Sequence, residues 1–420
     1  MKKQAEELRQ RLTKGQFLDD GKISLGNGQL ARAYEAGTIF YKGYAKAALP
    51  PEAQLQADLK EMIGIYEKYS PEYAVNDRKE TSATGKSSAL SHGMQKIFFG
   101  APGTGKSWRI EHDLWGNKSG LENVREGRKF RTTFHPDYDY AQFVGAYKPM
   151  EKSGKITYSF VPQVFAKAYA KAWVLWLKND EDKAKDKNVY LVIEEINRGN
   201  CAQIFGDIFQ LLDRDSKGFS EYSINADRDF AGWLKAADEG VKSVWEMYKE
   251  NVGEGKLKLP PNLNILATMN TSDQSLFPID SAFKRRFDWE YVPIDFSGKD
   301  AANYKIRIND ADGLMYSWES FATKVNAKIL DLTESEDKQL GEFFIKPDKD
   351  NFIISRDRFL GKVMFYLWNE VCKDEYKNGS FFREGENGEH FTFQDLYGKE
   401  GESKLKNFMD WITQENTPSE

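Results

Sequence analysis

One short stretch of the chain has the glycine spacing and the basic residue needed to bind phosphate. It reads "KIFFGAPGTGKSWRI", residues 96 to 110, and it satisfies the pattern G-x-x-x-x-G-K-[ST] between an apolar run and a helix-compatible run. Glycines let successive backbone N–H groups point at phosphate oxygens, and the following helix adds its N-terminal dipole. The sequence therefore predicts a nucleotide-binding loop made of Gly100, Pro102, Gly103, Thr104, Gly105, Lys106 and Ser107.

Two residues of this loop have individual chemical roles. Lys106 supplies a point charge for the β- and γ-phosphates, and the hydroxyl of Ser107 is a Mg²⁺ ligand. A glycine-rich surface turn is the alternative interpretation. The strand-like run before the loop and the helical run after it favour the nucleotide site.

Hydrolysis also needs acidic side chains on a neighbouring strand. The run "VYLVIEEINRGN" ends in Glu194 and Glu195, where side chains emerge at the carboxyl edge of a parallel sheet. We expect Glu194 to hold Mg²⁺ through water and Glu195 to orient or deprotonate the attacking water. The alternative is a solvated acidic helix cap after a buried strand.

Two further strings end or begin predicted strands with polar residues. "LNILATMNTSDQS" places Asn270 and Asp273 where a γ-phosphate or its water could be sensed, although the pattern alone indicates only a strand with a polar turn. "IDSAFKRRFDWEYV" offers Arg285 and Arg286. Such a charge run is usually a solvated face, but it could act as an arginine finger on a neighbouring subunit's nucleotide.

The pattern of apolar and helical runs around these residues predicts an α/β domain over residues 94–295, which would position them. The apolar runs "KIFFG", "VYLVIEE" and "LNILATMN" are typical of buried strands in a parallel sheet. Helical runs such as "PQVFAKAYAKAWVLWLKN" and "AQIFGDIFQLLDRD" lie between them, so we expect helices on both faces of the sheet. Residues 220–224 and 256–262 alternate like a strand pair around a helical insertion at 226–252, for which packing against the domain is the favoured role.

Two flanking regions complete the predicted organisation. Helical patterns dominate residues 296–420 and predict a smaller helical C-terminal domain. Residues 76–93 are rich in Ser, Thr and Gly and predict a flexible linker. Before it, residues 1–75 form a short α+β segment with a strand within "AGTIFYKGYA" and a helix starting at "PPEAQ".

Composition excludes several classes of protein. The formal net charge of -5 provides no global positive field for nucleic acid. Cys201 and Cys372 are far apart, which excludes a disulfide framework and a cysteine zinc site and fits a reducing compartment. Since no window approaches the length of an apolar membrane span, we expect a cytoplasmic protein without membrane contact.

Taken in order, "GAPGTGKS", "VIEEINRGN", "ATMNTSDQS" and "DSAFKRRFDW" resemble the McrB-like branch of the AAA+ superfamily, the motor subunits of modification-dependent restriction systems. The strings "EINRGN" and "MNTSDQS" are the branch-specific part. Residues 132–149 and 337–345 resemble further segments of that branch, the second being the start of its lid region. The N-terminal segment resembles the tail of an N-terminal domain of some McrB-like proteins, with most of that domain missing.

The resemblance implies properties that composition does not. Members form rings, usually hexamers, with GTP or ATP and Mg²⁺ at subunit interfaces, and they pair with a McrC-like nuclease subunit. It assigns phosphate and Mg²⁺ contacts to Lys106 and Ser107, the acidic motif to Glu194 and Glu195, and the sensor to Asn270. It further assigns the finger to Arg285 or Arg286 and an interface signature to Asn197 and Arg198.

Two departures from the family pattern matter. Glu194 stands where most AAA+ proteins carry Asp; its extra methylene could alter the position of Mg²⁺, although many McrB-like proteins tolerate a glutamate there. The short N-terminal segment leaves DNA binding to that region or to a partner, and no nuclease site is evident in the chain. The leading hypothesis is a triphosphate-driven ring motor for DNA translocation or nuclease activation in a restriction or phage-defence system. The alternatives are a MoxR-like protein-remodelling ATPase and, less favoured because the acidic pair is present, a nucleotide switch without turnover.

Overall fold

The computed structural model describes residues 93–413, except 117, 153, 179–186, 237–239, 272–276, 298, 310–312, 348–350, 374–380 and 386–387. It also describes four short strands nearer the N-terminus. The chain divides into two compact units, Met1–Lys86 and Ser87–Glu420. None of the described helices is long and apolar enough to cross a membrane.

The N-terminal unit contains two antiparallel strand pairs, β1 (Gln16–Phe17) with β4 (Phe40–Tyr41) and β2 (Lys22–Ser24) with β3 (Leu30–Arg32). The strand expected within "AGTIFYKGYA" corresponds to β4. The helix expected to begin at "PPEAQ" lies outside the described residues, as does the predicted linker except for Gly93.

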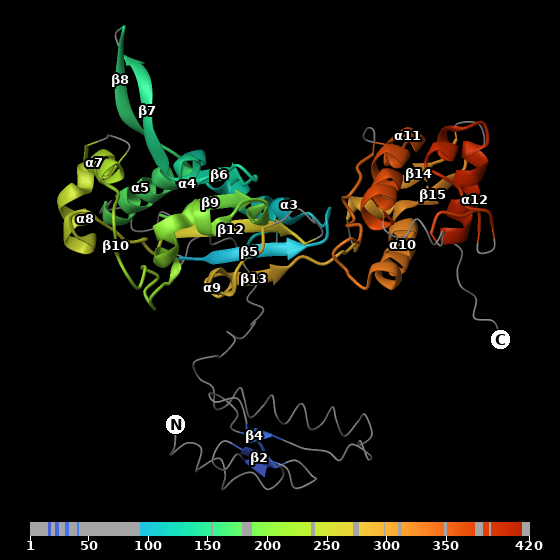
Figure 1. Cartoon of the computed structure of the whole chain (residues 1–420), viewed down its shortest axis with the longest axis horizontal. Helices are drawn as coiled ribbons and strands as arrows, with labels where there is room; N and C mark the ends of the chain where they lie inside the picture. The colour runs from blue at the N-terminus through green and yellow to red at the C-terminus, as the bar shows by residue number, and fades with distance from the viewer. Residues whose placement is uncertain are drawn as a thin grey trace. The chain divides into compact units, whose positions relative to one another are not determined.

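A five-stranded parallel sheet organises the first part of the second unit (Figure 1). Its spatial order is β13-β5-β12-β9-β6, with every neighbouring pair parallel. The strands are β5 (Gln95–Gly100), β6 (Lys129–Thr133), β9 (Val189–Glu194), β12 (Leu263–Asn270) and β13 (Asp288–Tyr291). The predicted α/β fold and its three quoted strands are confirmed.

Both faces of this sheet are covered, because alternate residues of each central strand face opposite sides. On one face Leu191 and Ile265 join a large core with α5 (Val164–Leu177). On the other face Tyr190 and Leu266 pack with α3 (Lys106–His112). The strands are nearly fully apolar for this reason, and the polar residues appear only at their carboxyl ends.

The helical insertion packs against the domain. Short strands β10 (Ile224–Asn225) and β11 (Lys256–Leu257) pair antiparallel and enclose α7 (Arg228–Ala236) and α8 (Trp245–Val252). Phe230, Trp233 and Tyr248 enter the large core. The predicted strand pair and helical insertion are therefore observed, with two helices in place of one. The predicted helix at 202–215 is in part a 3₁₀ turn, with α6 (Cys201–Phe205) followed by Gly206–Leu212.

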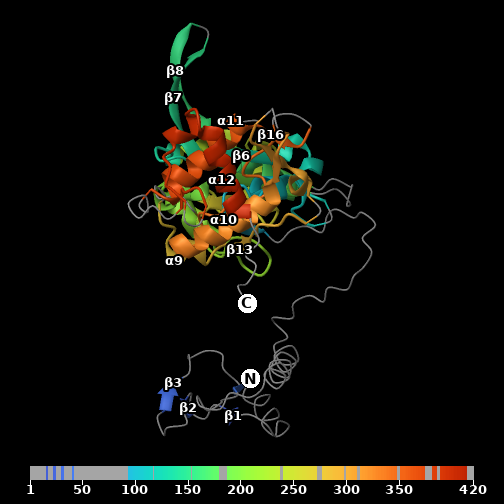
Figure 2. The same cartoon turned by 90° about the vertical axis from the view of Figure 1, so that its right-hand side faces the viewer.

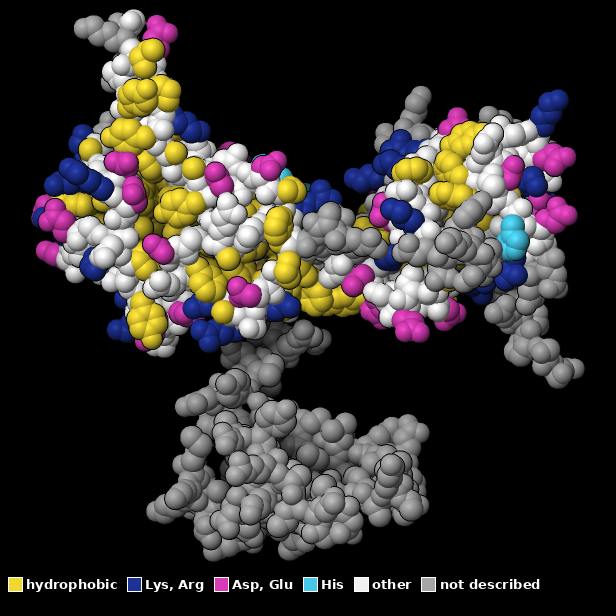
Figure 3. All heavy atoms as spheres, viewed as in Figure 1, with side chains coloured by type: hydrophobic (Ala, Val, Ile, Leu, Met, Phe, Trp, Pro, Cys, Tyr) yellow, Lys and Arg dark blue, Asp and Glu magenta, His cyan; other side chains and the backbone are white. Residues whose placement is uncertain are grey.

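A long hairpin stands out from the domain and was not predicted. Strands β7 (Gly145–Lys152) and β8 (Lys155–Pro162) pair along their full length, just after α4 (Tyr140–Phe143). They extend away from the neighbouring elements in two perpendicular views (Figures 1 and 2). Tyr147, Ile156 and Tyr158 are more than half exposed on it, and apolar side chains follow its length in the space-filling view (Figure 3).

The last part of the chain is a smaller, mainly helical region with its own core. Its helices are α10 (Trp318–Thr333), α11 (Arg356–Phe359) continuing into π-helical turns at Leu360–Met364 and Leu367–Val371, and α12 (Gly401–Thr413). Trp318, Phe359 and Phe408 are buried in this core. A small sheet, ordered β15-β14-β16, was not predicted; its strands are β14 (Lys305–Arg307), β15 (Met315–Ser317) and β16 (Ile353–Ile354).

Candidate functional site

The phosphate-loop lysine occupies the position that the motif predicts. The loop joins the end of β5 to the start of α3, with Gly105 in a left-handed conformation (φ 81°) as the cap. Lys106 Nζ donates to the carbonyl oxygens of Gly100 at 3.0 Å and Ala101 at 2.8 Å. Burial lowers the pKa of Lys106 to about 8, although Glu195 and Glu194 act to raise it. Both hydrogen-bond acceptors are neutral carbonyl groups. A bound phosphate group would add a negatively charged partner for this buried amine.

Glu194 is the centre of a hydrogen-bond network at the end of β9. Its Oε2 accepts from Ser107 Oγ at 2.8 Å and from Thr268 Oγ1 at 2.5 Å. Its Oε1 accepts from Arg131 Nη1 at 2.8 Å. The network joins α3, β12 and β6 to one carboxylate, because β9 lies between β12 and β6 in the sheet.

The residues present fit a Mg²⁺ ion that shares its ligands with a nucleotide. Mg²⁺ prefers oxygen ligands and commonly takes one or two from protein and the remainder from phosphates and water. Ser107 and Glu194 supply such oxygens beside the phosphate loop. Within the described part of the chain no cluster of three or more His, Cys, Asp or Glu could hold a metal by itself.

Glu195 turns away from Glu194 through an unusual backbone conformation. Its φ of 54° and ψ of 48° lie in the left-handed region, which a non-glycine residue adopts at a cost of about 1–3 kcal/mol. The turn brings its Oε1 to 2.7 Å from Asn270 Nδ2, and its backbone N–H donates to Thr268 Oγ1 at 3.2 Å. The two adjacent glutamates therefore face different partners.

Asn197 and Arg198, the two residues that follow Ile196, contact the end of β12 and Glu195. Asn197 Nδ2 donates to the backbone oxygen of Asn270 at 2.7 Å, and its own carbonyl accepts from Phe277 N at 2.9 Å. Arg198 Nε lies 3.8 Å from Glu195 Oε2. The structure thus brings Glu195, Asn197, Arg198 and Asn270 together, whereas Asp273 lies outside the described residues.

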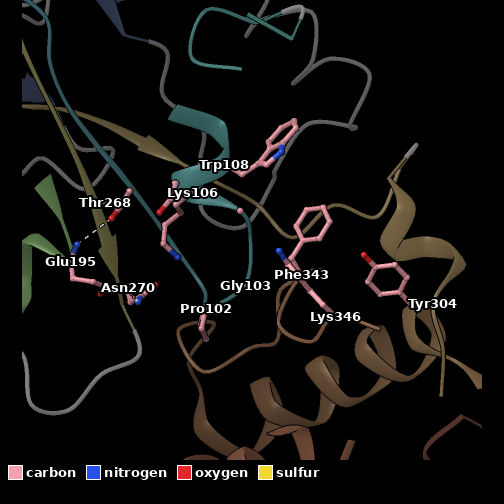
Figure 4. Close-up of a pocket in the computed structure, with 12 residues that line it drawn as sticks. Pro102, Gly103, Lys106, Trp108, Glu195, Thr268, Asn270, Tyr304, Phe343 and Lys346 are labelled. Atoms are coloured by element: carbon pink, nitrogen blue, oxygen red, sulfur yellow. Dashed lines mark hydrogen bonds between the residues drawn. The ribbon is translucent and has the colours of Figure 1, made fainter. Parts of the chain in front are cut away.

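A cavity of about 520 Å³ adjoins the loop (Figure 4). Glu195, Thr268 and Asn270 lie on one side of Lys106, and Phe343, Tyr304 and Lys346 lie toward the helical region. Sequence reasoning missed the contributions of Thr268, Trp108, Tyr304, Phe343 and Lys346. Of these, only Trp108 could have been placed near the site from the sequence, because it directly follows the loop motif.

Residues Leu340–Phe344, here named the lid strap, bind the backbone of the phosphate loop. The N–H of Gly341 donates to Pro102 O at 2.9 Å, and the N–H of Phe343 donates to Gly103 O at 2.8 Å. A Cβ at Gly341 would lie 2.3 Å from the carbonyl carbon of Gly103, so this close approach requires glycine. The helical region is thereby attached to the loop through main-chain atoms.

The strap is itself anchored in the helical region by a buried acid. Glu342 is fully buried and forms an ion pair with Lys299. Its backbone oxygen accepts from Trp318 Nε1 at 2.9 Å. Backbone contacts on the loop side and an ion pair on the other side therefore fix the strap between the two parts.

The two finger candidates differ in their surroundings. Arg286 Nη2 lies 2.5 Å from Asp213 Oδ2, its guanidinium lies 4.0 Å from the ring centre of Phe209, and its side chain is 8% exposed. Arg285 is exposed at the end of α9 (Ser281–Lys284). Arg286 is held within its own subunit, so Arg285 is the better candidate for a group that reaches another subunit.

Two parts of the chain match known protein families. Residues 96–287 match the family model of the AAA domain (dynein-related subfamily), and residues 1–71 match that of the MrcB-like N-terminal domain. The AAA match includes the phosphate loop, Glu194, Glu195 and Asn270, and it ends just before β13. An AAA domain implies nucleoside-triphosphate binding and hydrolysis.

Two curated relatives belong to restriction systems. The type II restriction enzyme BsuMI component YdiS of Bacillus subtilis is 34% identical over 319 residues, 69% of this chain and 83% of that protein. The EcoKMcrB subunit of the type IV methyl-directed restriction enzyme of Escherichia coli is 27% identical over 275 residues, 63% of this chain and 47% of that protein. A solved structure from Cytophaga hutchinsonii matches at 13% identity with a TM-score of 0.27, over 75% of this chain and 64% of that one, and carries no argument.

These relatives do not favour the remodelling alternative, since both are components of restriction enzymes. The N-terminal family match, the AAA domain and the 34% identity over most of the Bacillus protein agree with one another. The chain belongs to the McrB-like family of AAA+ proteins.

Proposed function

We propose that this chain is the ring-forming motor of a restriction or phage-defence system, hydrolysing GTP or ATP to drive DNA translocation or to activate a nuclease partner. The observation that carries the proposal is the Glu195 carboxylate, held 2.7 Å from Asn270 beside the cavity that Lys106 lines. A base and a polar sensor beside the phosphate loop, at the carboxyl ends of β9 and β12, are the parts that hydrolysis needs and that nucleotide binding alone does not.

The proposed reaction is attack of water on the γ-phosphate. Lys106 binds the phosphates, Asn270 and Glu195 orient the water, and Glu195 accepts its proton as the new oxygen–phosphorus bond forms. The bond from the γ-phosphorus to the bridging oxygen breaks, and the nucleoside diphosphate leaves. Mg²⁺ bound by Ser107 and Glu194 would neutralise charge on the phosphates.

The assembly is proposed from the family. Arg285 would complete the site on a neighbouring subunit in a homo-oligomeric, hexameric ring, and a McrC-like nuclease subunit would engage that ring. DNA would bind through the N-terminal region or through the partner. Support comes from the match of residues 1–71 to the MrcB-like N-terminal domain and from the relatives' membership of restriction enzymes.

Glu195→Gln tests the site. We expect nucleotide affinity to stay within a few-fold and turnover to fall by about 10²–10⁴, because the amide cannot accept the proton. Phosphate release should be measured with ATP and GTP in parallel over a range of protein concentrations.

The matched control is Glu334→Gln. Glu334 is also a glutamate in the left-handed region, with φ 51°, but it ends α10. The Glu334→Gln variant therefore shows how much a glutamine in the left-handed conformation changes stability by itself, apart from any effect on catalysis. Hydrolysis that survives Glu195→Gln would show that the base has been assigned wrongly.

A further inference from the structure

Arg131 makes a contact at the site that no motif predicts. It lies on β6, the strand at the edge of the sheet, where its Cα pairs with Val192 of β9. Its guanidinium reaches two carboxylates, with Nη1 2.8 Å from Glu194 Oε1 and Nη2 2.6 Å from Glu111 Oε2. Lys129 Nζ, 3.3 Å from Glu111 Oε1, holds that second carboxylate in turn.

The contacts of Glu194 are divided between its two oxygens. Arg131 donates to Oε1, while the hydroxyls of Ser107 and Thr268 donate to Oε2. Oε2 is therefore the oxygen that lies beside Ser107, the other proposed Mg²⁺ ligand. The oxygen held by Arg131 is the other one.

A glutamate at this position needs such an anchor more than an aspartate would. Its carboxylate has one more rotatable bond, and each side-chain torsion that must be ordered costs free energy. A planar guanidinium bound to two carboxylates has a fixed geometry, which a flexible ammonium group lacks. Arg131 can therefore hold Glu194 in one orientation before the nucleotide arrives.

We propose that Arg131 is a positioning residue that orients the Glu194 carboxylate for Mg²⁺ bound with nucleotide. The proposal rests on the proposed function, because it assumes that Ser107 and Glu194 form the metal site. It also makes a prediction of definite sign. If only charge mattered, removing a cation beside the site would strengthen Mg²⁺ binding; if orientation matters, removing Arg131 weakens it.

The test is Arg131→Gln, with Mg²⁺ titrated against binding of a fluorescent nucleotide. We expect the half-saturating Mg²⁺ concentration to rise about tenfold, at the lower end of the effects seen when partners of metal ligands are removed, because Arg131 is 41% exposed. Nucleotide affinity in a chelator should be unchanged. An unchanged or lower half-saturating Mg²⁺ concentration would overturn the proposal.

Arg109→Gln is the matched control. Arg109 also contacts two carboxylates, Glu290 at 2.7 Å and Asp113 at 3.8 Å, with a side chain 39% exposed, but it does not contact Glu194. The Arg109→Gln variant should have the same half-saturating Mg²⁺ concentration as the protein without substitutions. If Arg131→Gln fails to fold, Arg131→Lys keeps the charge without the bidentate fork and should give an intermediate increase; no increase there would also contradict the proposal.

A double-mutant cycle tests why the anchor is needed. On a Glu194→Asp background the carboxylate is one methylene shorter, so we expect Arg131→Gln to change the Mg²⁺ requirement less than on the natural background. An equal effect on both backgrounds would reject orientation of the longer side chain as the reason. If the unchanged protein bound no nucleotide at any Mg²⁺ concentration, the proposed function would fail instead, which is a distinct result.

Discussion

The phosphate loop is held from two sides by different kinds of contact. On the sheet side, side chains make the contacts, as when Ser107 donates to Glu194. On the side of the helical region, backbone N–H groups of Gly341 and Phe343 donate to loop carbonyls. Side-chain contacts depend on residue type and can be recognised as motifs, whereas backbone contacts can be made by many sequences and leave little trace except a required glycine.

An effect comparable to that of Glu195→Gln is expected outside both sides, at the end of α9. Arg285→Ala should lower turnover by about 10³-fold, as loss of an arginine finger does, without loss of stability. Arg286→Ala should instead lower the free energy of unfolding by about 2 kcal/mol, less than for a fully buried pair because Asp213 is partly exposed. Phosphate release and thermal unfolding separate the two arginines.

Mixing variants tests whether the finger acts between subunits. Arg285→Ala protein retains an intact phosphate loop, and Lys106→Ala protein retains an intact arginine. A mixture should recover part of the turnover, since one interface then has both. If no mixing ratio restores activity, the proposal that Arg285 acts on a neighbouring subunit's nucleotide is wrong. Each subunit would then have to contain all of its own catalytic residues.

A smaller effect is expected from pH on the sheet side. With a pKa of about 8 in the free protein, Lys106 loses its proton as pH rises through 8, whereas bound phosphates favour the charged form. Nucleotide affinity should therefore fall above pH 8, by at most about tenfold per unit, and binding there should take up a proton. Calorimetry from pH 7 to about 9.5 measures both quantities.

The sign for stability follows from the same shift. The pKa of Lys106 in the folded protein without nucleotide is below the ordinary lysine value of 10.5, so the unfolded chain binds the proton more tightly. The contribution of this group to the free energy of unfolding therefore rises between about pH 8 and 10.5. In the Lys106→Arg variant the guanidinium stays charged, so its nucleotide affinity should not depend on this titration. Equal pH profiles for the two proteins would exclude Lys106 as the titrating group.

The smallest expected effect tests the backbone side. Gly341→Ala places a methyl group against Gly103 and should lower the free energy of unfolding by about 1–3 kcal/mol and weaken nucleotide binding a few-fold. Gly361→Ala, in the same helical region with nothing within 4 Å of the added Cβ, is the control. Equal unfolding and binding curves for both variants would mean that the strap does not support the loop.

The residues on the sheet side could be singled out from the sequence for a physical reason. Glycine spacing, Lys106 and the acidic pair follow from the geometry of phosphate binding within one short loop and at one strand end. Thr268 and Arg131 lie on other strands, and a single Thr or Arg in a strand has no pattern that distinguishes it from a solvated residue.

The strap and the hairpin were missed for different reasons. The strap acts through backbone atoms, so its string could be related to a lid region but not to contact with the loop. The hairpin strands β7 and β8 carry apolar side chains that are exposed, at Tyr147, Ile156 and Tyr158. The strands therefore lack the alternation of buried apolar and exposed polar residues by which a strand is usually recognised in a sequence.

The hairpin has the shape of a lever arm, long at one end and packed at the other. Phe160, at its base, packs against Phe230 and Trp233 of α7 with ring centres 5.9 and 6.0 Å apart. Each arm has eight residues and is therefore about 26 Å long. From Phe160 to the tip at Lys155 the arm is about 20 Å long, so a tilt of about 10° at Phe160 would move the tip by roughly 3–4 Å. A small rotation of α7 would in this way become a larger displacement at the tip.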